Sequence, residues 1–215
     1  MKWPILFGKA RQQPTTGRWH HWKQLIADHC EGRCVYCAIA EARFGGIRNF
    51  HIEHYRPKVR FPHLENDIRN LYLACAVCNV LKCDDWPAEP DPDHSLPAYP
   101  DPAVVDYNSL FQVAETHEIS SSTVAGRYVI ERMALNRAQL ILERRLHAIE
   151  SAISSFNDWV SERLDALTPE EQRQTIEILN DIIRAQTATT TARPYKDDDT
   201  KRSARVRTTK KRRSR

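Results

Sequence analysis

Four cysteines form two Cys-x2-Cys pairs, Cys34/Cys37 and Cys75/Cys78. Each pair can present two sulfur atoms to one side of a short turn, and two such pairs can close a tetrahedral thiolate cage around zinc. Four thiolates leave no open coordination position, so a zinc ion bound here is structural and does not activate water. Four buried free cysteines are the alternative, and the doubled spacing favours zinc.

Two further cysteines, Cys30 and Cys83, are left over from this pattern. Each either takes the place of one cage cysteine or is a spare thiol. Because thiols stay reduced inside cells, the clustering of all six cysteines favours a metal site over disulfides.

The segment between the two pairs, residues 38–74, holds a dense group of polar side chains. It contains His51-Ile-Glu-His-Tyr-Arg-Pro-Lys58 and, leading into the second pair, Asn70-Leu-Tyr-Leu-Ala-Cys75. Asn79 follows the second pair directly, and Lys82 comes three residues later. A lone Glu-His pair, or a lone asparagine after a cysteine, would not be informative. Their joint placement around two Cys-x2-Cys pairs resembles the HNH endonuclease motif.

This resemblance covers about residues 30–86 and implies a ββα-metal finger. The alternation of Phe50, Ile52 and His54 suits the first strand of such a finger. Residues 70–74 suit the second strand, and residues 79–82 would begin the helix.

Phosphodiester hydrolysis needs a base that deprotonates water and a hard cation that stabilises the charge on the phosphate and the departing oxygen. His54 is the candidate base, because imidazole titrates near neutral pH. Glu53 and Asn79 are the candidate ligands of a catalytic Mg²⁺ or Mn²⁺, since both offer oxygen atoms. Neighbouring strand residues point to opposite faces, so the resemblance implies a distortion at the strand end that lets Glu53 and His54 converge.

By the same resemblance, Asn70 steadies the loop and the base and is not a metal ligand. Arg56, Lys58 and Lys82 are candidate contacts to substrate phosphate, with a merely solvated charged loop as the alternative for the basic residues after the strand. His51 would share a strand face with Glu53, so it is either a third ligand or a structural neighbour of the ligands.

The composition excludes a membrane-spanning protein. Of 215 residues, 41% are hydrophobic and 28% are charged, and the longest apolar candidate, Leu71–Leu81, is too short for a span. The apolar stretch Trp3–Gly8 is too short for a secretory signal. We therefore expect a cytoplasmic protein. The formal charge of +4 hides an asymmetry, because residues 200–215 are rich in Lys and Arg and contain no acid, which leaves the rest of the chain net negative.

Apolar spacing predicts helices at residues 18–29 and 124–134, and a long helix whose apolar stripe runs from Leu142 to Leu164. Asn136 is a candidate N-cap for the long helix, and Thr168, Pro169 and Glu171 form a capping box for a further one. Six prolines between Pro87 and Pro102 predict an irregular connection.

A weaker likeness extends beyond the motif. With Ala134-Leu-Asn136 and Arg144-Arg145, the chain resembles the HNH effectors of Septu-type and retron-associated antiphage systems, which act beside an ATPase partner. The helical half would then be the docking surface for that partner. Cys83 departs from the shared pattern, since a glycine commonly follows the lysine there, and the basic tail is not part of that pattern. DNA binding is the simplest role for the tail.

These observations predict an α+β fold, with a zinc-stapled nuclease module, a mainly helical C-terminal half and a disordered basic tail. The expected organisation is a helical lead-in (1–29), the HNH module with its four-cysteine zinc site (30–86), a proline-rich linker (87–108), a helical region (109–190) and the tail (191–215). The expected function is metal-dependent cleavage of nucleic acid, with DNA as the expected substrate. The alternatives are a stand-alone HNH nuclease without an ATPase, and a non-catalytic zinc module that binds nucleic acid or protein.

Overall fold

The computed structural model describes residues 1–163 and 166–191 and has a mixed α/β fold, as expected. Its strands are β1 (Phe50–His54), β2 (Leu71–Cys75), β3 (Gln112–Val113) and β4 (Ile119–Ser120). Its α-helices are α1 (Lys23–His29), α2 (Ala76–Lys82), α3 (Tyr107–Leu110), α4 (Val124–Arg132), α5 (Ala138–Arg163) and α6 (Pro169–Thr191). The chain divides into two compact units, one formed by Lys2–Arg137 and the other beginning at Ala138.

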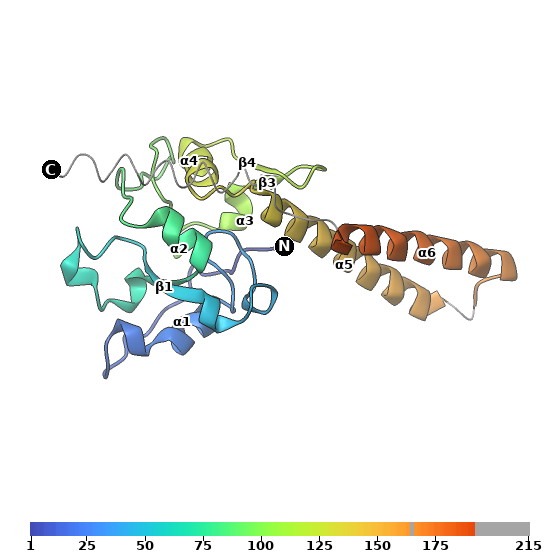
Figure 1. The fold of residues 1–215 in the computed structure, drawn as a ribbon, viewed down its shortest axis with the longest axis horizontal. Coiled ribbons are helices and arrows are strands. Elements are labelled where there is room, and N and C mark those ends of the chain that lie inside the picture. Colours follow the sequence, from blue (N-terminus) through green and yellow to red (C-terminus); the bar gives the residue numbers. More distant parts are fainter. Residues whose placement is uncertain (164–165, 192–215) are drawn as a thin grey trace. The chain divides into compact units, whose positions relative to one another are not determined.

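A short antiparallel hairpin and the helix that follows it form the centre of the first unit (Figure 1). β1 pairs with β2 from Phe50↔Cys75 at one end to His54↔Leu71 at the other. The predicted strand–strand–helix order is therefore confirmed. The helix begins at Ala76 rather than at Asn79, because the chain turns directly after the extended Cys75 (φ −66°, ψ 156°).

The hairpin lies in the core of this unit, since all five residues of β2 are buried. α1 packs near it and buries Ile26 and Ala27. The helix predicted over residues 18–29 is interrupted, because Trp22 (φ −96°, ψ 16°) separates α1 from a single 3₁₀ turn at Trp19–His21.

The proline-rich segment was expected to separate two domains, but it packs into the first unit. Tyr99 is buried; its carbonyl accepts a hydrogen bond from Tyr55 Oη at 2.6 Å, and its own hydroxyl donates to Asp85 Oδ2 at 2.9 Å. Asp85 also accepts hydrogen bonds from Tyr128 and Arg132 of α4. Prolines prevent a regular helix here but do not prevent burial of the aromatic residues between them.

The first unit also contains the short α3, a small β3–β4 hairpin and α4. α4 matches the helix predicted at 124–134. Thr123 caps α4 by accepting a hydrogen bond from Gly126 N at 3.0 Å. The Asn136 side chain, predicted to cap the next helix, instead exchanges two hydrogen bonds with the backbone of Ile119 in β4. α5 begins two residues later, at Ala138, so Asn136 is not the residue that precedes it.

The second unit is a pair of long helices, α5 and α6, that contact each other. The apolar stripe predicted on α5 is less exposed than its neighbours, as seen at Leu146, Ile149 and Ile153. The predicted capping box is confirmed, because Thr168 N donates to Glu171 Oε2 at 2.8 Å and Glu171 N donates to Thr168 Oγ1 at 3.4 Å.

No helix within 1–163 and 166–191 is long and apolar enough to cross a membrane. The predicted basic tail at 191–215 lies outside the described residues apart from Thr191, the last residue of α6.

Candidate zinc cage and nuclease site

The two cysteine pairs meet at the end of the hairpin where β1 begins. The Sγ atoms of Cys34, Cys37, Cys75 and Cys78 all lie within 4.8 Å of one another, and all four residues are buried. Cys37 and Cys75 have their sulfur atoms 3.8 Å apart. A tetrahedral zinc site with Zn–S bonds of about 2.3 Å requires sulfur atoms about 3.8 Å apart. The four residues therefore fit a structural zinc ion, which they would hold with no open coordination position.

Arg137 lies beside this cage, although nothing in the sequence singled it out. Its Nη2 is 3.9 Å from Cys78 Sγ, and its Nη1 donates to the Met133 carbonyl at 3.1 Å. Burial opposes the charge of Arg137, but the neighbouring thiolates outweigh it and raise its pKa. A zinc ion with four thiolates carries a net charge of −2, so Arg137 offsets part of that charge.

The two left-over cysteines do not belong to the cage. Cys30 is buried, accepts a hydrogen bond from Leu73 N at 3.3 Å, and has its pKa raised to about 11 by burial, so it is a neutral thiol. Cys83 is exposed and follows α2 with φ +50°, a conformation that favours glycine. This explains why a glycine suits that position in the motif.

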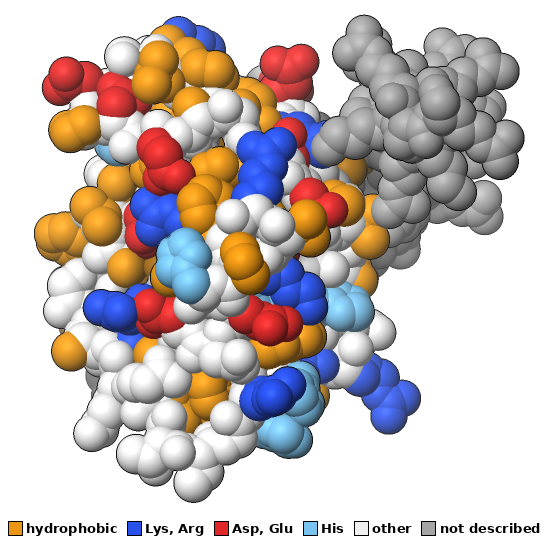
Figure 2. All heavy atoms as spheres, turned by 90° about the vertical axis from the view of Figure 1, so that its left-hand side faces the viewer, with side chains coloured by type: hydrophobic (Ala, Val, Ile, Leu, Met, Phe, Trp, Pro, Cys, Tyr) orange, Lys and Arg blue, Asp and Glu red, His pale blue; other side chains and the backbone are white. Residues whose placement is uncertain are grey.

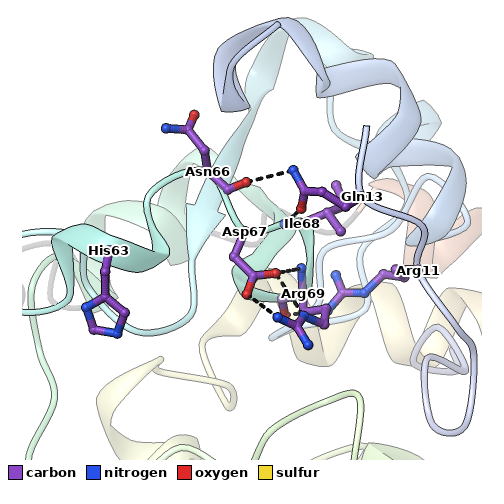
Figure 3. A pocket seen from close by; sticks show the side chains of 7 residues that line it. All are labelled: Arg11, Gln13, His63, Asn66, Asp67, Ile68 and Arg69. Carbon is purple, nitrogen blue, oxygen red and sulfur yellow. Dashed lines mark hydrogen bonds and ion pairs between the residues drawn. The ribbon is translucent and has the colours of Figure 1, made fainter. Parts of the chain in front are cut away.

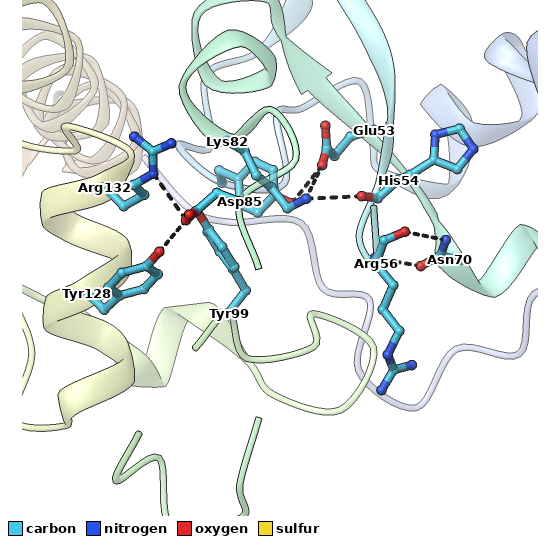
Figure 4. A network of polar contacts seen from close by, with 10 residues as sticks. Glu53, His54, Arg56, Asn70, Lys82, Asp85, Tyr99, Tyr128 and Arg132 are labelled. Carbon is cyan, nitrogen blue, oxygen red and sulfur yellow. Dashed lines mark hydrogen bonds and ion pairs between the residues drawn. The ribbon is translucent and has the colours of Figure 1, made fainter. Parts of the chain in front are cut away.

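At the other end of the hairpin, Glu53 and His54 point to opposite faces of β1 (Figure 4). The strand is regular to its end, with Glu53 opposite Tyr72 and His54 opposite Leu71. The distortion that the family resemblance implied is absent here. The two side chains do not converge, because side chains alternate along a regular strand.

Glu53 is buried and already has a cationic partner. Its Oε1 lies 2.6 Å from Lys82 Nζ and 3.4 Å from the hydroxyl of Tyr36, which donates to it. Burial raises the pKa of Glu53, while Lys82 acts in the opposite direction. Lys82 was expected to contact phosphate, but its side chain has no exposed surface and its ammonium points into the protein. The reason is its place in the last turn of α2, from which Nζ also donates to the His54 carbonyl at 3.1 Å.

The His54 imidazole lies half-buried on the other face of the strand. Its Nε2 is 3.0 Å from the Glu65 carbonyl oxygen. The Trp19 ring packs edge-on against the imidazole, with the two ring centres 5.1 Å apart. Burial lowers the pKa of His54, and the positive charge of Lys58 acts in the same direction, against the raising effect of the hydrogen bond to Glu65. The ring is therefore neutral at pH 7. When Nε2 donates to Glu65, the lone pair that can accept a proton is on Nδ1.

Asn70 holds the loop that follows β1. Its Oδ1 accepts a hydrogen bond from Arg56 N at 2.8 Å, and its Nδ2 donates to Arg56 O at 3.1 Å and to Leu64 O at 3.3 Å. Both ends of the amide are engaged with the backbone, which is the arrangement expected of a residue that steadies the loop.

Two of the candidate phosphate contacts lie at the surface near His54. Arg56 Nη2 pairs with Glu89 Oε2 at 2.9 Å, and Lys58 Nζ lies 3.4 Å from Glu65 Oε1 and 4.8 Å from the Trp19 ring centre. Such exposed ion pairs contribute at most about 1 kcal/mol, so a polyanion can replace the carboxylates at small cost.

Asn79 and His51 differ from Glu53 in their exposure to solvent. Asn79 is half-buried in α2, and His51 is exposed on β1 while Glu53 is buried. Among the described residues, the four cysteines are the one group of cysteine, histidine and carboxylate side chains close enough to share an ion.

An open pocket of about 470 Å³ lies beside the loop between the strands, lined by Arg11, Gln13, His63, Asn66, Asp67, Ile68 and Arg69 (Figure 3). Its polar groups are used internally. Arg11 donates to the carbonyls of Leu71 and Arg69, and Asp67 pairs with Arg69. We therefore infer that the residues lining this pocket hold the loop between β1 and β2 in place. Figure 2 shows one face of the molecule, where acidic side chains lie between basic ones over the upper and central parts and basic and histidine side chains gather towards the lower right.

Three residues near the candidate nuclease site were not predicted from the sequence. Trp19 has the spacing of a helix-packing residue, Tyr36 is hidden inside the first cysteine pair, and Glu65 contributes through its backbone carbonyl. The spacing of Trp19 offered no signal of its contact with His54, because that contact depends on the fold.

Comparison with known proteins finds a similarity for one segment of the chain, the segment that contains the cysteine cage and the β1–β2 hairpin. No curated protein and no solved structure matches the sequence. A family model described as HNH endonuclease matches residues 34–85, a segment that spans both cysteine pairs, β1, β2 and α2. Residues 34–85 are therefore similar to HNH endonuclease domains.

Proposed function

We propose that this protein is a metal-dependent endonuclease that hydrolyses phosphodiester bonds of DNA. The observation that carries the proposal is the His54 imidazole, which is neutral, half-buried and anchored through Nε2 inside an HNH domain. A neutral imidazole with one nitrogen held and the other free to accept a proton is suited to general-base catalysis.

In the proposed reaction, His54 accepts a proton from the attacking water at Nδ1, while the Glu65 carbonyl keeps the ring oriented. Asn70 supports this arrangement by fixing the backbone of Arg56 and Leu64, so the loop that carries Glu65 stays in place. Arg56 and Lys58 contact the substrate phosphates, because both lie at the surface after β1.

Glu53 and Asn79 remain the proposed ligands of the catalytic Mg²⁺ or Mn²⁺, since a carboxylate and an amide oxygen are the donors such ions prefer. The bound cation would stabilise the negative charge that develops on the phosphate and on the departing oxygen. The described arrangement does not present such a site, because Glu53 is buried against Lys82.

The zinc ion that the four cysteines can hold has a structural role in this proposal, since no coordination position remains for water. A reduced thiolate cage also suits the cytoplasm, where we place the protein.

We further propose that the nuclease is the effector of a bacterial antiphage defence system and acts with an ATPase partner that docks on the helical half. The support is the likeness of the motif around Asn70, Asn79 and Ala134-Leu-Asn136 to Septu-type and retron-associated effectors. A gene for an ATPase beside the gene for this protein would support the partnership, and its absence would remove it without affecting the chemistry.

Cleavage of supercoiled plasmid by chelator-treated protein, with Mg²⁺ or Mn²⁺ added back, tests the nuclease. Wild type should nick or linearise the plasmid, and His54→Ala should lower the rate by about 10² to 10⁴ with unchanged zinc content. Equal cutting by both proteins would contradict the role of His54. Cutting by neither protein, alone or with the ATPase, would favour the non-catalytic zinc module, whereas full activity without any ATPase would favour a stand-alone nuclease.

A further inference from the structure

Lys82 is the one fully buried lysine among the described residues, and two oxygen atoms lie close to its ammonium group. Its ammonium lies 2.6 Å from Glu53 Oε1 and 3.1 Å from the His54 carbonyl oxygen. The exposed fraction is 0% for the Lys82 side chain and 5% for that of Glu53. A lysine is almost never fully buried without a partner, so this pair is a specific contact and not an accident of a flexible surface chain.

The two oxygens that surround the ammonium are of the kinds that a divalent cation also binds. One is a carboxylate oxygen and the other a backbone carbonyl oxygen, and both are hard ligands. The Tyr99 ring closes a further side, with its centre 5.5 Å from Lys82 Nζ. The ammonium therefore lies where two hard oxygen atoms, one of them anionic, come together.

Lys82 also comes from the element that supplies the other proposed ligand. Asn79 lies three residues earlier in α2, so the two residues share one side of the same short helix. A divalent ion bound at Glu53 Oε1 would lie close to the Lys82 ammonium, and repulsion between the two cations opposes their simultaneous binding.

We propose that Lys82 is an internal cation that competes with the divalent ion for Glu53. The metal then loads only when the Lys82 ammonium leaves the Glu53 carboxylate. This inference rests on the proposed function, which expects a divalent ion at Glu53. It explains how the carboxylate is kept buried and neutralised without metal, and it makes Lys82 a residue that sets metal affinity instead of a contact to phosphate.

The first test uses the wild-type protein and a reagent that modifies amines, with modification at each lysine measured by mass spectrometry. Lys82 should react slowly without metal, and saturating Mn²⁺ should raise its reactivity several-fold, while exposed Lys9 serves as the internal reference. Unchanged reactivity of Lys82 at saturating Mn²⁺ would overturn the proposal. This measurement requires no substitution and so does not depend on a variant that folds.

The second test compares Mn²⁺ binding by wild type and Lys82→Met, with free Mn²⁺ measured by electron paramagnetic resonance and zinc content checked in both. If Lys82 occupies the site about nine-tenths of the time, its removal should tighten binding about tenfold. Lys9→Met, which removes an exposed partner of Glu31, should leave binding unchanged, and adding Glu53→Gln to Lys82→Met should abolish the gain.

The outcomes separate this inference from the proposed function. Tighter binding by Lys82→Met supports the competition. Equal or weaker binding overturns it and leaves the metal-dependent nuclease intact. Absence of Mn²⁺ binding by both proteins overturns the competition and the proposed catalytic cation together.

Discussion

The zinc cage and the Glu53–Lys82 pair lie at opposite ends of the same β1–β2 hairpin, and they bury charge in different ways. The cage is at the end where Phe50 pairs with Cys75, and Glu53 is near the end where His54 pairs with Leu71. Four cysteines that can hold zinc come together at the first end, whereas the carboxylate at the second end has Lys82. We therefore expect the first end to depend on metal for folding and the second end to fold without it.

Loss of one cage ligand should have the largest effect. Cys75→Ser should release zinc and unfold the unit formed by residues 2–137, because a structural zinc site contributes about 10–16 kcal/mol, as much as the whole stability of a domain. Circular dichroism and zinc analysis measure this. Cys83→Ser, which changes an exposed cysteine outside the cage, should keep both zinc and fold. A zinc-free Cys75→Ser protein with native-like melting would break the comparison.

Neutralising the carboxylate at the other end should have a smaller but clear effect. Glu53→Gln leaves the buried Lys82 ammonium without its counter-charge and should lower the free energy of unfolding by about 3 kcal/mol in urea denaturation. Glu31→Gln removes the partner of exposed Lys9 and should cost less than about 1 kcal/mol. Equal stability of the two variants would show that the buried pair does not hold this end together.

Arg137 gives a further test of this comparison. It places a positive charge beside the cage cysteines, as Lys82 does beside Glu53. Arg137→Gln should weaken zinc binding about 10- to 100-fold in competition with a chelator, as expected for loss of a group that contacts a metal ligand. Arg127→Gln, which removes a hydrogen bond to the Ser122 carbonyl, is the matched control and should not change zinc affinity. Identical affinities in both variants would remove Arg137 from the zinc site.

The smallest predicted effect concerns the pKa of His54. The positive charge of Lys58 helps to hold that pKa below the ordinary value of 6.5, so Lys58→Gln should raise it. The acid limb of the cleavage rate should move to higher pH with it, because a general base must be unprotonated. Lys58 is partly exposed, so we expect the change in the pKa of His54 to be small and to shrink at high salt.

NMR titration of the His54 imidazole measures this shift directly. Lys9→Gln serves as the control, because Lys9 pairs with Glu31 and does not contribute to the pKa of His54. A titration that moves to lower pH in Lys58→Gln would contradict the prediction.

Local sequence patterns, together with the resemblance to the HNH motif, predicted the elements around the two cysteine pairs and their order. Alternating residues Phe50, Ile52 and His54 predict β1, and the paired cysteines predict where the chain turns back to close a cage. The Thr168 capping box is equally local, because its hydrogen bonds join residues three apart. Patterns of this kind depend on the period of a strand or helix and need no knowledge of distant partners.

Contacts between distant parts of the chain could not be predicted in the same way. The prolines of residues 87–102 indicated an irregular segment, but only the fold shows Tyr99 buried between Tyr55, Asp85 and α4. Arg137 likewise reaches the zinc cage because the turn after α4 returns the chain to Cys78.

The sequence by itself determined which side chains could perform the chemistry: four cysteines for zinc, His54 as a base, and Glu53 and Asn79 as oxygen donors. The tertiary structure alone decided their partners. It turned Lys82 inward to Glu53, set the Glu65 carbonyl and the Trp19 ring on His54, and kept β1 regular so that its last two side chains diverge. Residue types carry chemical capacity, whereas burial and pairing depend on which distant segments the folded core brings together.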